Sequence, residues 1–141
     1  MEKVRVLFLC VHNSARSQMA EAFFKKYAQS EFDALSAGIE PGKLNQNVVK
    51  VMMEIGIDIS QNKTKSVFDL HENKETFSHV VTVCSPEAAE QCPIFPGVLK
   101  NYHWPFDDPS QFTGDDAINK TREVRDAIEI KVKEFIEEIN N

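Results

Sequence analysis

Residues 4–17, with the sequence VRVLFLCVHNSARS, indicate the class of fold that the chain adopts. The first six of them form an apolar, partly β-branched run that is too short for a helix and is typical of a buried strand. The polar residues near the end of the stretch favour a turn and the start of a helix. Over residues 17–29, large apolar side chains recur every four positions, at Met19, Phe23 and Tyr27, which predicts an amphipathic helix. The chain is therefore predicted to begin with a strand, a loop and a helix.

The rest of the chain alternates between short apolar runs and helical patterns. We expect further strands at residues 32–37, 79–83 and 100–104, and helices at residues 47–55, 66–72 and from about 114 to the end. Strands that alternate with helices predict a parallel sheet with helices on both faces and right-handed crossovers. Because no internal repeat or linker is evident, the sequence predicts a single α/β domain over residues 1–141.

The composition of the 141-residue chain is that of an ordinary soluble domain, with 42% hydrophobic and 27% charged residues. A formal net charge of -6 argues against a nucleic-acid partner, because proteins that bind nucleic acids usually carry a basic patch on their surface. No apolar stretch approaches the roughly 18 residues that a membrane helix needs, and the start of the chain has no signal-peptide pattern. The three cysteines, an odd number, then predict a reduced, cytoplasmic protein rather than a secreted disulfide framework.

Several chemically active side chains directly follow predicted strands. Cys10 follows the first strand, Cys84 the third, and Asp107 and Asp108 the fourth. In open parallel sheets, ligands bind beyond the carboxyl ends of the strands. We therefore expect these side chains to meet at one edge of the sheet and to form a site.

The loop that starts at Cys10 has the residue types of an oxyanion site. It joins a buried strand to a helix, where consecutive backbone N–H groups and the positive helix end can surround an anion. Arg16 adds a planar cationic fork that binds two oxygens at once. The same groups favour the thiolate, so we expect a lowered pKa and a nucleophilic role for Cys10. The expected anion-binding residues are Val11, His12, Asn13, Ser14, Ala15, Arg16 and Ser17.

Three of these loop residues have further expected roles. Ser17 can donate a hydrogen bond to the sulfur. The Asn13 side chain can form hydrogen bonds across its own loop and fix the loop conformation. His12 is not expected to act as a base, because a thiolate stabilised by the loop needs none. The alternative for the whole motif is a buried cysteine at a strand end with Arg16 on the surface.

A thiolate that attacks a tetrahedral oxyanion needs an acid to protonate the departing oxygen. We predict that Asp108, next to Pro109, is this acid, with Asp107 as the other candidate. The alternative is that the Asp-Pro pair only forms a turn.

Cys84 and Cys92 have seven residues between them, which suits neither a zinc knuckle nor a two-residue redox motif. We therefore expect no metal and no other cofactor. A loop with two thiols can pass oxidation outward by disulfide exchange. The alternative is that both are simply buried thiols.

Together these residues resemble the low-molecular-weight tyrosine phosphatase superfamily, and most closely its thioredoxin-coupled arsenate reductase branch. The resemblance extends over nearly the whole chain. It is carried by FLCVHNSARSQMAEA at residues 8–22, SAG at 36–38, MEIGID at 53–58, VC at 83–84, CP at 92–93 and HWPFDDP at 103–109.

The resemblance implies a three-layer α/β/α domain with a four-stranded parallel sheet. It also implies that Cys10 attacks arsenate, that Asp108 protonates the leaving oxygen and that Cys84 then attacks the Cys10 sulfur, releasing arsenite. Cys92 would next attack Cys84, and thioredoxin or another thiol reductant would reduce the Cys84–Cys92 disulfide.

The chain departs from the branch at several positions. Ala15 stands where many relatives carry a cysteine, and the gap between Cys84 and Cys92 is one residue longer than in many thioredoxin-coupled members. Some relatives bind a potassium ion near the loop. Asn13, Glu21 and Ser36 match their ligands, but no fourth ligand is evident, so no metal is expected.

Two other functions remain open on the sequence. A phosphatase would hydrolyse phosphate monoesters through a Cys10 phosphoenzyme and would need neither Cys84 nor Cys92. The tyrosine-rich stretch that such phosphatases place after the Asp-Pro pair is absent here. A non-enzymatic thiol redox sensor would form the Cys84–Cys92 disulfide without turnover.

Overall fold

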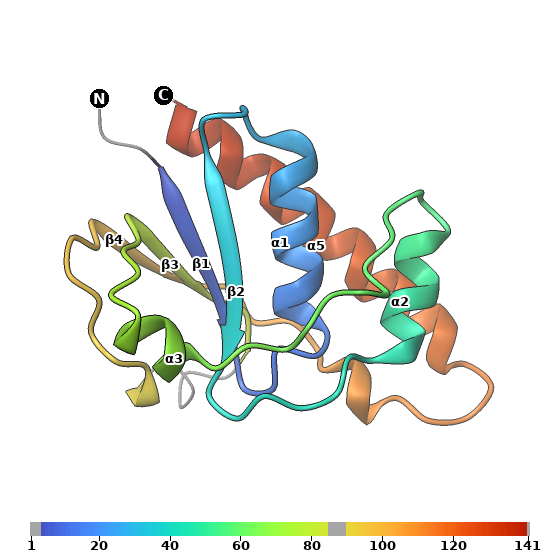
Figure 1. Ribbon diagram of the computed structural model, residues 1–141. Helices are drawn as coiled ribbons and strands as arrows, with labels where there is room; N and C mark the ends of the chain where they lie inside the picture. The colour runs from blue at the N-terminus through green and yellow to red at the C-terminus, as the bar shows by residue number, and fades with distance from the viewer. Residues whose placement is uncertain (1–3, 85–89, 141) are drawn as a thin grey trace.

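The computed structural model describes residues 4–84 and 90–140, and in them a four-stranded sheet carries the fold (Figure 1). The strands are all parallel and lie in the order β2-β1-β3-β4. This confirms the predicted parallel sheet and each of its four strands to within a residue or two. Their bounds are β1 Arg5–Cys10, β2 Asp33–Gly38, β3 His79–Thr82 and β4 Lys100–His103.

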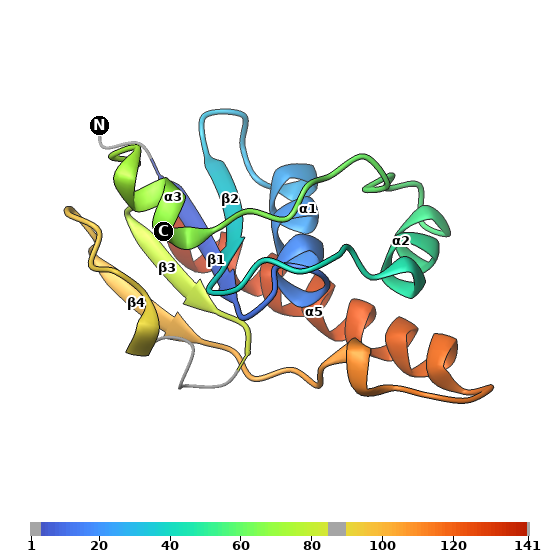
Figure 2. The same cartoon turned by 60° about the horizontal axis from the view of Figure 1, so that its bottom comes forward.

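The helices lie on both faces of the sheet, which confirms the three-layer α/β/α arrangement. Figures 1 and 2 show α1 and α5 together on one face, α3 on the other, and α2 against α5. No described helix is both long and apolar enough to cross a bilayer. The bounds are α1 Arg16–Tyr27, α2 Gln46–Met53, α3 Val67–Glu72, the 3-10 helix η1 Pro109–Gln111 and α5 Ala117–Asn140.

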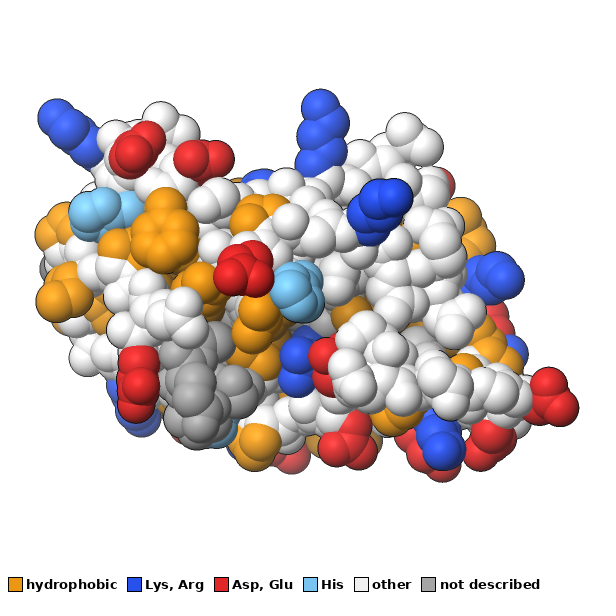
Figure 3. Space-filling model, turned by 90° about the horizontal axis from the view of Figure 1, so that it is seen from below, with side chains coloured by type: hydrophobic (Ala, Val, Ile, Leu, Met, Phe, Trp, Pro, Cys, Tyr) orange, Lys and Arg blue, Asp and Glu red, His pale blue; other side chains and the backbone are white. Residues whose placement is uncertain are grey.

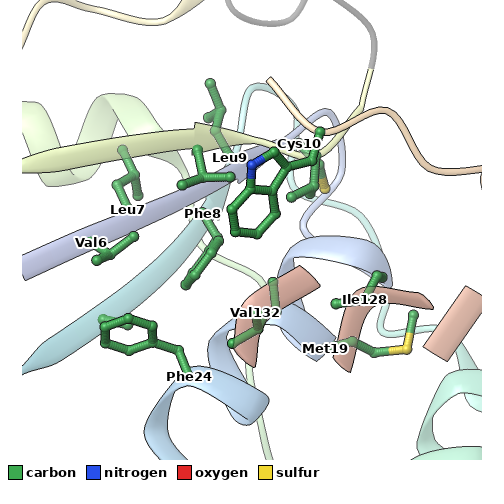
Figure 4. Packing of buried hydrophobic residues seen from close by; sticks show 14 of the residues in the cluster. Val6, Leu7, Phe8, Leu9, Cys10, Met19, Phe24, Ile128 and Val132 are labelled. Atoms are coloured by element: carbon green, nitrogen blue, oxygen red, sulfur yellow. The ribbon is translucent and has the colours of Figure 1, made fainter. Parts of the chain in front are cut away.

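The apolar run of β1 is buried on both of its faces, which explains why it does not alternate with polar residues. Residues 6–9 have no exposed surface. Phe8 points toward α1 and packs edge-on against Phe24, with ring centroids 5.9 Å apart (Figure 4). Leu9 faces the opposite layer, where it lines a cavity together with Phe95. β1 is thus a central strand, and its carboxyl end lies between two neighbours.

Local signals set the ends of α2. The Asn45 side chain accepts a hydrogen bond from Val48 N, which caps the start of the helix. Gly56 has a φ of 82° just past the last turn, and Ile57 N donates to Met52 O. Gly56 thus forms a C-terminal glycine cap.

Candidate active site

The loop of residues 11–15 leaves the end of β1 and leads directly into α1. Three of its five carbonyl groups, and that of Cys10, accept hydrogen bonds from the segment that follows β2. Four backbone N–H groups of this segment donate hydrogen bonds of 2.8–3.2 Å. The pairs are Ile39 N to Cys10 O, Glu40 N to Val11 O, Gly42 N to His12 O and Asn45 N to Ser14 O. With these carbonyl groups engaged outside, the loop is arranged to present N–H groups on its inner side.

Asn13 is the residue around which the loop turns. It is fully buried and has a φ of 55°, a left-handed conformation that asparagine tolerates better than most residues. Its side-chain amide donates to Ser17 Oγ at 2.8 Å, and its Oδ1 accepts from Lys65 N at 2.9 Å. The prediction that Asn13 bridges its own loop is confirmed.

The Cys10 sulfur is buried and has two polar neighbours. Asn13 N–H donates to Cys10 Sγ at 3.1 Å, and Ser17 Oγ lies 3.1 Å from the same atom. Ser17 Oγ also accepts from the Asn13 amide, and in its contact with the sulfur either atom can be the donor. A backbone N–H group and a hydroxyl group thus lie within hydrogen-bond distance of the predicted nucleophile.

The inner side of the loop provides donors for an anion. Within residues 4–84 and 90–140, the loop N–H groups that donate no hydrogen bond are those of Val11, His12, Ser14 and Ala15. Helix α1 begins at Arg16, so its positive end lies at the same place. His12 itself is exposed, and its Nδ1 lies 2.8 Å from Glu40 O.

The structure brings Arg16 and Asp108 together beside this loop. Arg16 Nη1 donates to Phe106 O at 3.0 Å, and Nη2 lies 3.6 Å from Asp108 Oδ2. The other Asp108 oxygen caps η1 by accepting from Ser110 N at 3.0 Å. Asp107 is exposed and lines a separate groove together with Phe106 and Phe112. Of the two candidate acids, Asp108 is thus the one that contacts the loop arginine.

Cys84 lies at the end of β1 on the side of β3. It is buried, and its sulfur faces Leu9 O at 3.9 Å, next to Cys10 in the chain. The Cys84 carbonyl accepts a hydrogen bond from His103 Nε2 at the end of β4. The sheet therefore brings the first two cysteines of the predicted relay to neighbouring positions.

Cys92 lies on the segment that covers the other face of the sheet. It is partly exposed, and it lines a cavity of about 410 Å³ together with Leu9, Thr82 and His103. Its thiol donates to Pro93 O at 3.3 Å, and burial raises the pKa of Cys92 to about 11. In this position the Cys92 thiol is protonated at neutral pH. Residues 85–89, which include Ser85 and Pro86, lie outside the described residues.

Hydrophobic side chains are exposed on the same half of the molecule. Viewed from the carboxyl ends of the strands, they gather on the part of the surface that carries α3 and β4 (Figure 3). Two large exposed hydrophobic side chains belong to this half, Phe68 in α3 and Ile94 two residues after Cys92. This half contains Cys92, whereas the Arg16 and Asp108 pair belongs to the side of η1.

Comparison with known proteins agrees with this geometry. The family model for low molecular weight phosphotyrosine protein phosphatase matches residues 5–141. The chain belongs to this family. It is 45% identical to the arsenate reductase of Halalkalibacterium halodurans over 139 residues, which cover 97% of this chain and 98% of that protein.

Solved structures give the same result. The arsenate reductase of Archaeoglobus fulgidus is 31% identical, with a TM-score of 0.74 over 93% of this chain and 98% of that chain. A thioredoxin-dependent arsenate reductase of Corynebacterium glutamicum is 26% identical, with a TM-score of 0.73 over 99% of this chain and 63% of that chain. The predicted place among the arsenate reductases of the phosphatase family is confirmed.

The residues that match the potassium site of some family members do not fit the ion here. Ser36 Oγ donates to Glu21 Oε1 at 2.6 Å. The ammonium group of Lys25 lies 2.8 Å from Glu21 Oε2, and that of Lys65 lies 3.8 Å from Oε1. Asn13 Oδ1 is occupied by two N–H donors. Two lysines thus already supply the positive charge beside Glu21.

Two residues that shape the loop were not predicted from the sequence. Gly38 leaves no room for a side chain, because a Cβ there would lie 2.6 Å from Val11 O. Gln18 is fully buried and contacts Asn13. In the sequence, Gly38 stands out only as part of a family motif. Gln18 likewise stands out only as part of the family stretch at residues 8–22, and its residue type and spacing do not indicate that it holds the loop.

Proposed function

We propose that the chain reduces arsenate to arsenite through a relay of Cys10, Cys84 and Cys92. The observation that supports this function best is the pair of further cysteines around a phosphatase-type loop. Cys84 is buried beside the end of β1, and Cys92 lines a cavity that Leu9 also lines. A phosphatase would need only Cys10, Arg16 and Asp108.

In the first step, arsenate enters the loop and is held by the inner N–H groups and by Arg16. The guanidinium turns from Phe106 O and Asp108 to the anion, which offers it two oxygens in one plane. The Cys10 thiolate attacks arsenic and forms a sulfur–arsenic bond. Asp108 donates its proton to the departing oxygen, which leaves as water.

In the second step, the Cys84 thiolate attacks the Cys10 sulfur. The sulfur–arsenic bond breaks and its electron pair stays on arsenic, which is thereby reduced from As(V) to As(III). Arsenite leaves, and a Cys10–Cys84 disulfide remains. Cys84 lies next to the end of β1. For this step its sulfur must come within disulfide-bonding distance of Cys10 Sγ.

In the third step, the Cys92 thiolate attacks Cys84 Sγ and releases the Cys10 thiolate. Cys92 must first lose its proton, which its buried position disfavours. The segment that carries Cys92 therefore has to move away from its present surroundings before the exchange. The Cys84–Cys92 disulfide is then reduced by a dithiol donor, for which thioredoxin is our choice. A relay of reduced thiols needs a reducing compartment, which supports a cytoplasmic location.

The test couples the protein to thioredoxin, thioredoxin reductase and NADPH and follows NADPH consumption after arsenate is added. We expect steady arsenate-dependent turnover in the wild type. Cys10→Ser should abolish both arsenate reduction and phosphate ester hydrolysis. Cys84→Ser and Cys92→Ser should each stop multiple turnover and leave ester hydrolysis intact.

The outcomes separate the alternatives. If Cys92→Ser cycles normally with thioredoxin, the relay is wrong. If the wild type forms the Cys84–Cys92 disulfide without turnover, the protein is a redox sensor. If it hydrolyses esters but does not reduce arsenate, it is a phosphatase. Repeating the assay with a glutaredoxin system identifies the reductant.

A further inference from the structure

One carbonyl group of the anion loop is held differently from the others. The carbonyl oxygens of residues 10, 11, 12 and 14 all accept from backbone N–H groups of the segment after β2, and Ala15 O accepts from Met19 N inside α1. Asn13 O accepts instead from a side chain, that of Gln18, at 3.1 Å. Among the carbonyl groups of residues 10–15, that of Asn13 is therefore the one whose hydrogen-bond donor can be removed by substituting a side chain.

The orientation of this carbonyl fixes the direction of an N–H group that an anion would use. The C=O of Asn13 and the N–H of Ser14 belong to the same planar trans peptide unit and point in opposite directions. While Asn13 O is bonded to Gln18, Ser14 N–H is turned away from Gln18. If this peptide plane flipped, it would exchange a donor for an acceptor in the loop and would repel an anion.

Gln18 also acts on the Cys10 sulfur through the Asn13 side chain. Gln18 Nε2 lies 3.1 Å from Asn13 Oδ1, and the other end of the same Asn13 amide donates to Ser17 Oγ. Ser17 in turn contacts Cys10 Sγ. Gln18 thus fixes both the backbone and the side chain of the residue that donates to the nucleophile.

The surroundings of Gln18 explain why an amide is needed at this position. Gln18 has no exposed surface, and burying an amide is costly unless its hydrogen bonds are made. Its nitrogen also reaches Lys63 O at 3.1 Å, and its oxygen accepts from Asn62 Nδ2 at 3.1 Å. An apolar side chain would fill the same space without the desolvation cost but would leave Asn13 O without its donor.

We propose that Gln18 is a positioning residue for the oxyanion, and that it holds the Asn13–Ser14 peptide in the anion-binding orientation. The inference rests on the proposed function only in taking the loop as an oxyanion site. It does not depend on Cys84 or Cys92. Its test therefore uses inorganic phosphate as the probe, together with hydrolysis of p-nitrophenyl phosphate.

The first variant is Gln18→Met, which keeps the length of the side chain and removes the hydrogen bonds. Calorimetric titration with phosphate should show binding that is about tenfold to a hundredfold weaker, with kcat/KM for the ester reduced to match. Gln46→Met is the control, because Gln46 begins α2, is exposed, and also donates to a nearby carbonyl, Leu44 O, at 3.2 Å. It should leave both quantities unchanged.

The second variant is Gln18→Glu, which converts the donor into a group whose proton depends on pH. As a carboxylate, the introduced side chain would repel both Asn13 oxygens, whereas as a carboxylic acid it would donate one hydrogen bond to them. The ratio of variant to wild-type phosphate affinity should therefore rise as the pH is lowered from about 8 to about 4. A purely structural effect on stability would not restore binding on acidification.

Two results would overturn the inference. One is a Gln18→Met protein that binds phosphate as tightly as the wild type. The other is a Gln18→Glu affinity ratio that does not change with pH, and this result decides the matter if the Met variant does not fold. A wild-type protein that binds phosphate but forms no Cys84–Cys92 disulfide with arsenate would overturn the proposed relay and leave the role of Gln18 intact.

Discussion

Gly38→Ala tests whether the anion loop depends on the close approach of β2. A Cβ at residue 38 would lie 2.6 Å from Val11 O and 2.9 Å from both His12 C and Asn13 N. All three are main-chain atoms of the loop, so no rotamer change relieves the contact. Since ordinary contacts begin near 3.4 Å, the loop and the strand must separate by roughly 0.8 Å.

The strand has little freedom to retreat. Gly38 pairs with Cys10 in the sheet, and its N–H donates to Lys65 O at 2.8 Å. We therefore expect the loop to move and to carry Asn13 N–H away from the Cys10 sulfur. A displacement of about 1 Å at a reacting centre can cost on the order of a hundredfold in rate, and overpacking of this kind costs about 1–3 kcal/mol of stability.

The assay compares Gly38→Ala with Gly42→Ala, a control at a second glycine beside the loop. A Cβ at residue 42 would lie 3.4 Å from the His12 Cβ, and no main-chain atom is among its nearest neighbours. The control should keep the wild-type kcat/KM for p-nitrophenyl phosphate, whereas Gly38→Ala should lose about a hundredfold. Urea unfolding verifies that both variants are folded. Wild-type kcat/KM in folded Gly38→Ala would refute the reasoning.

Three further predictions concern charged and thiol groups. Asp108→Asn should slow the first chemical step by about a hundredfold without weakening phosphate binding, and an unchanged single-turnover rate would move the acid to Asp107 or to water. Iodoacetamide should modify Cys92 slowly at pH 7 and about tenfold faster for each added pH unit below its pKa of about 11, as followed by peptide mass spectrometry. The pKa of Glu54 is lowered by hydrogen bonds to Arg122 and Arg125, so its stabilising contribution is present above the unfolded pKa of 4.5 and is lost as the pH falls through the folded value. Glu54→Gln should consequently lower the melting temperature at pH 7 more than at pH 3, and an equal effect at both pH values would contradict this.

The parts of the fold that the sequence predicts well are those determined by burial. β1 is apolar at every position of residues 6–9 because helices or covering segments lie on both sides of it. Helix α1 follows from the spacing of Met19 and Phe23, both fully buried. The loop between β1 and α1 was also predictable. A strand, a turn and a helix, with Cys10 and Arg16 on either side of the turn, are typical of an anion-binding loop.

The parts that the sequence did not reveal depend on contacts between distant segments. Gly38 is needed only because the loop passes over the end of β2. Gln18 is close to Asn13 in the chain, but its buried position also depends on contacts with Asn62 and Lys63, which are distant in the chain. The raised pKa of Cys92 arises from the residues that bury it, which include some distant in the chain. Helical or strand periodicity carries no information on any of these contacts.

The position of Cys10 on a central strand suits both a phosphatase-type loop and the proposed thiol relay. In the sheet, Cys10 pairs with Gly38 of β2 on one side, and on the other side Val83 N donates to Leu9 O as the chain leaves β3. The β2 side has no side chain at this level, which lets the loop turn back over the strand end. The β3 side continues into Cys84, which brings a second thiol to the same place. On an edge strand, Cys10 would have only one such neighbour, and either the loop support or the relay cysteine would be lost. The proposed chemistry therefore requires β1 to lie between β2 and β3, as it does in this sheet.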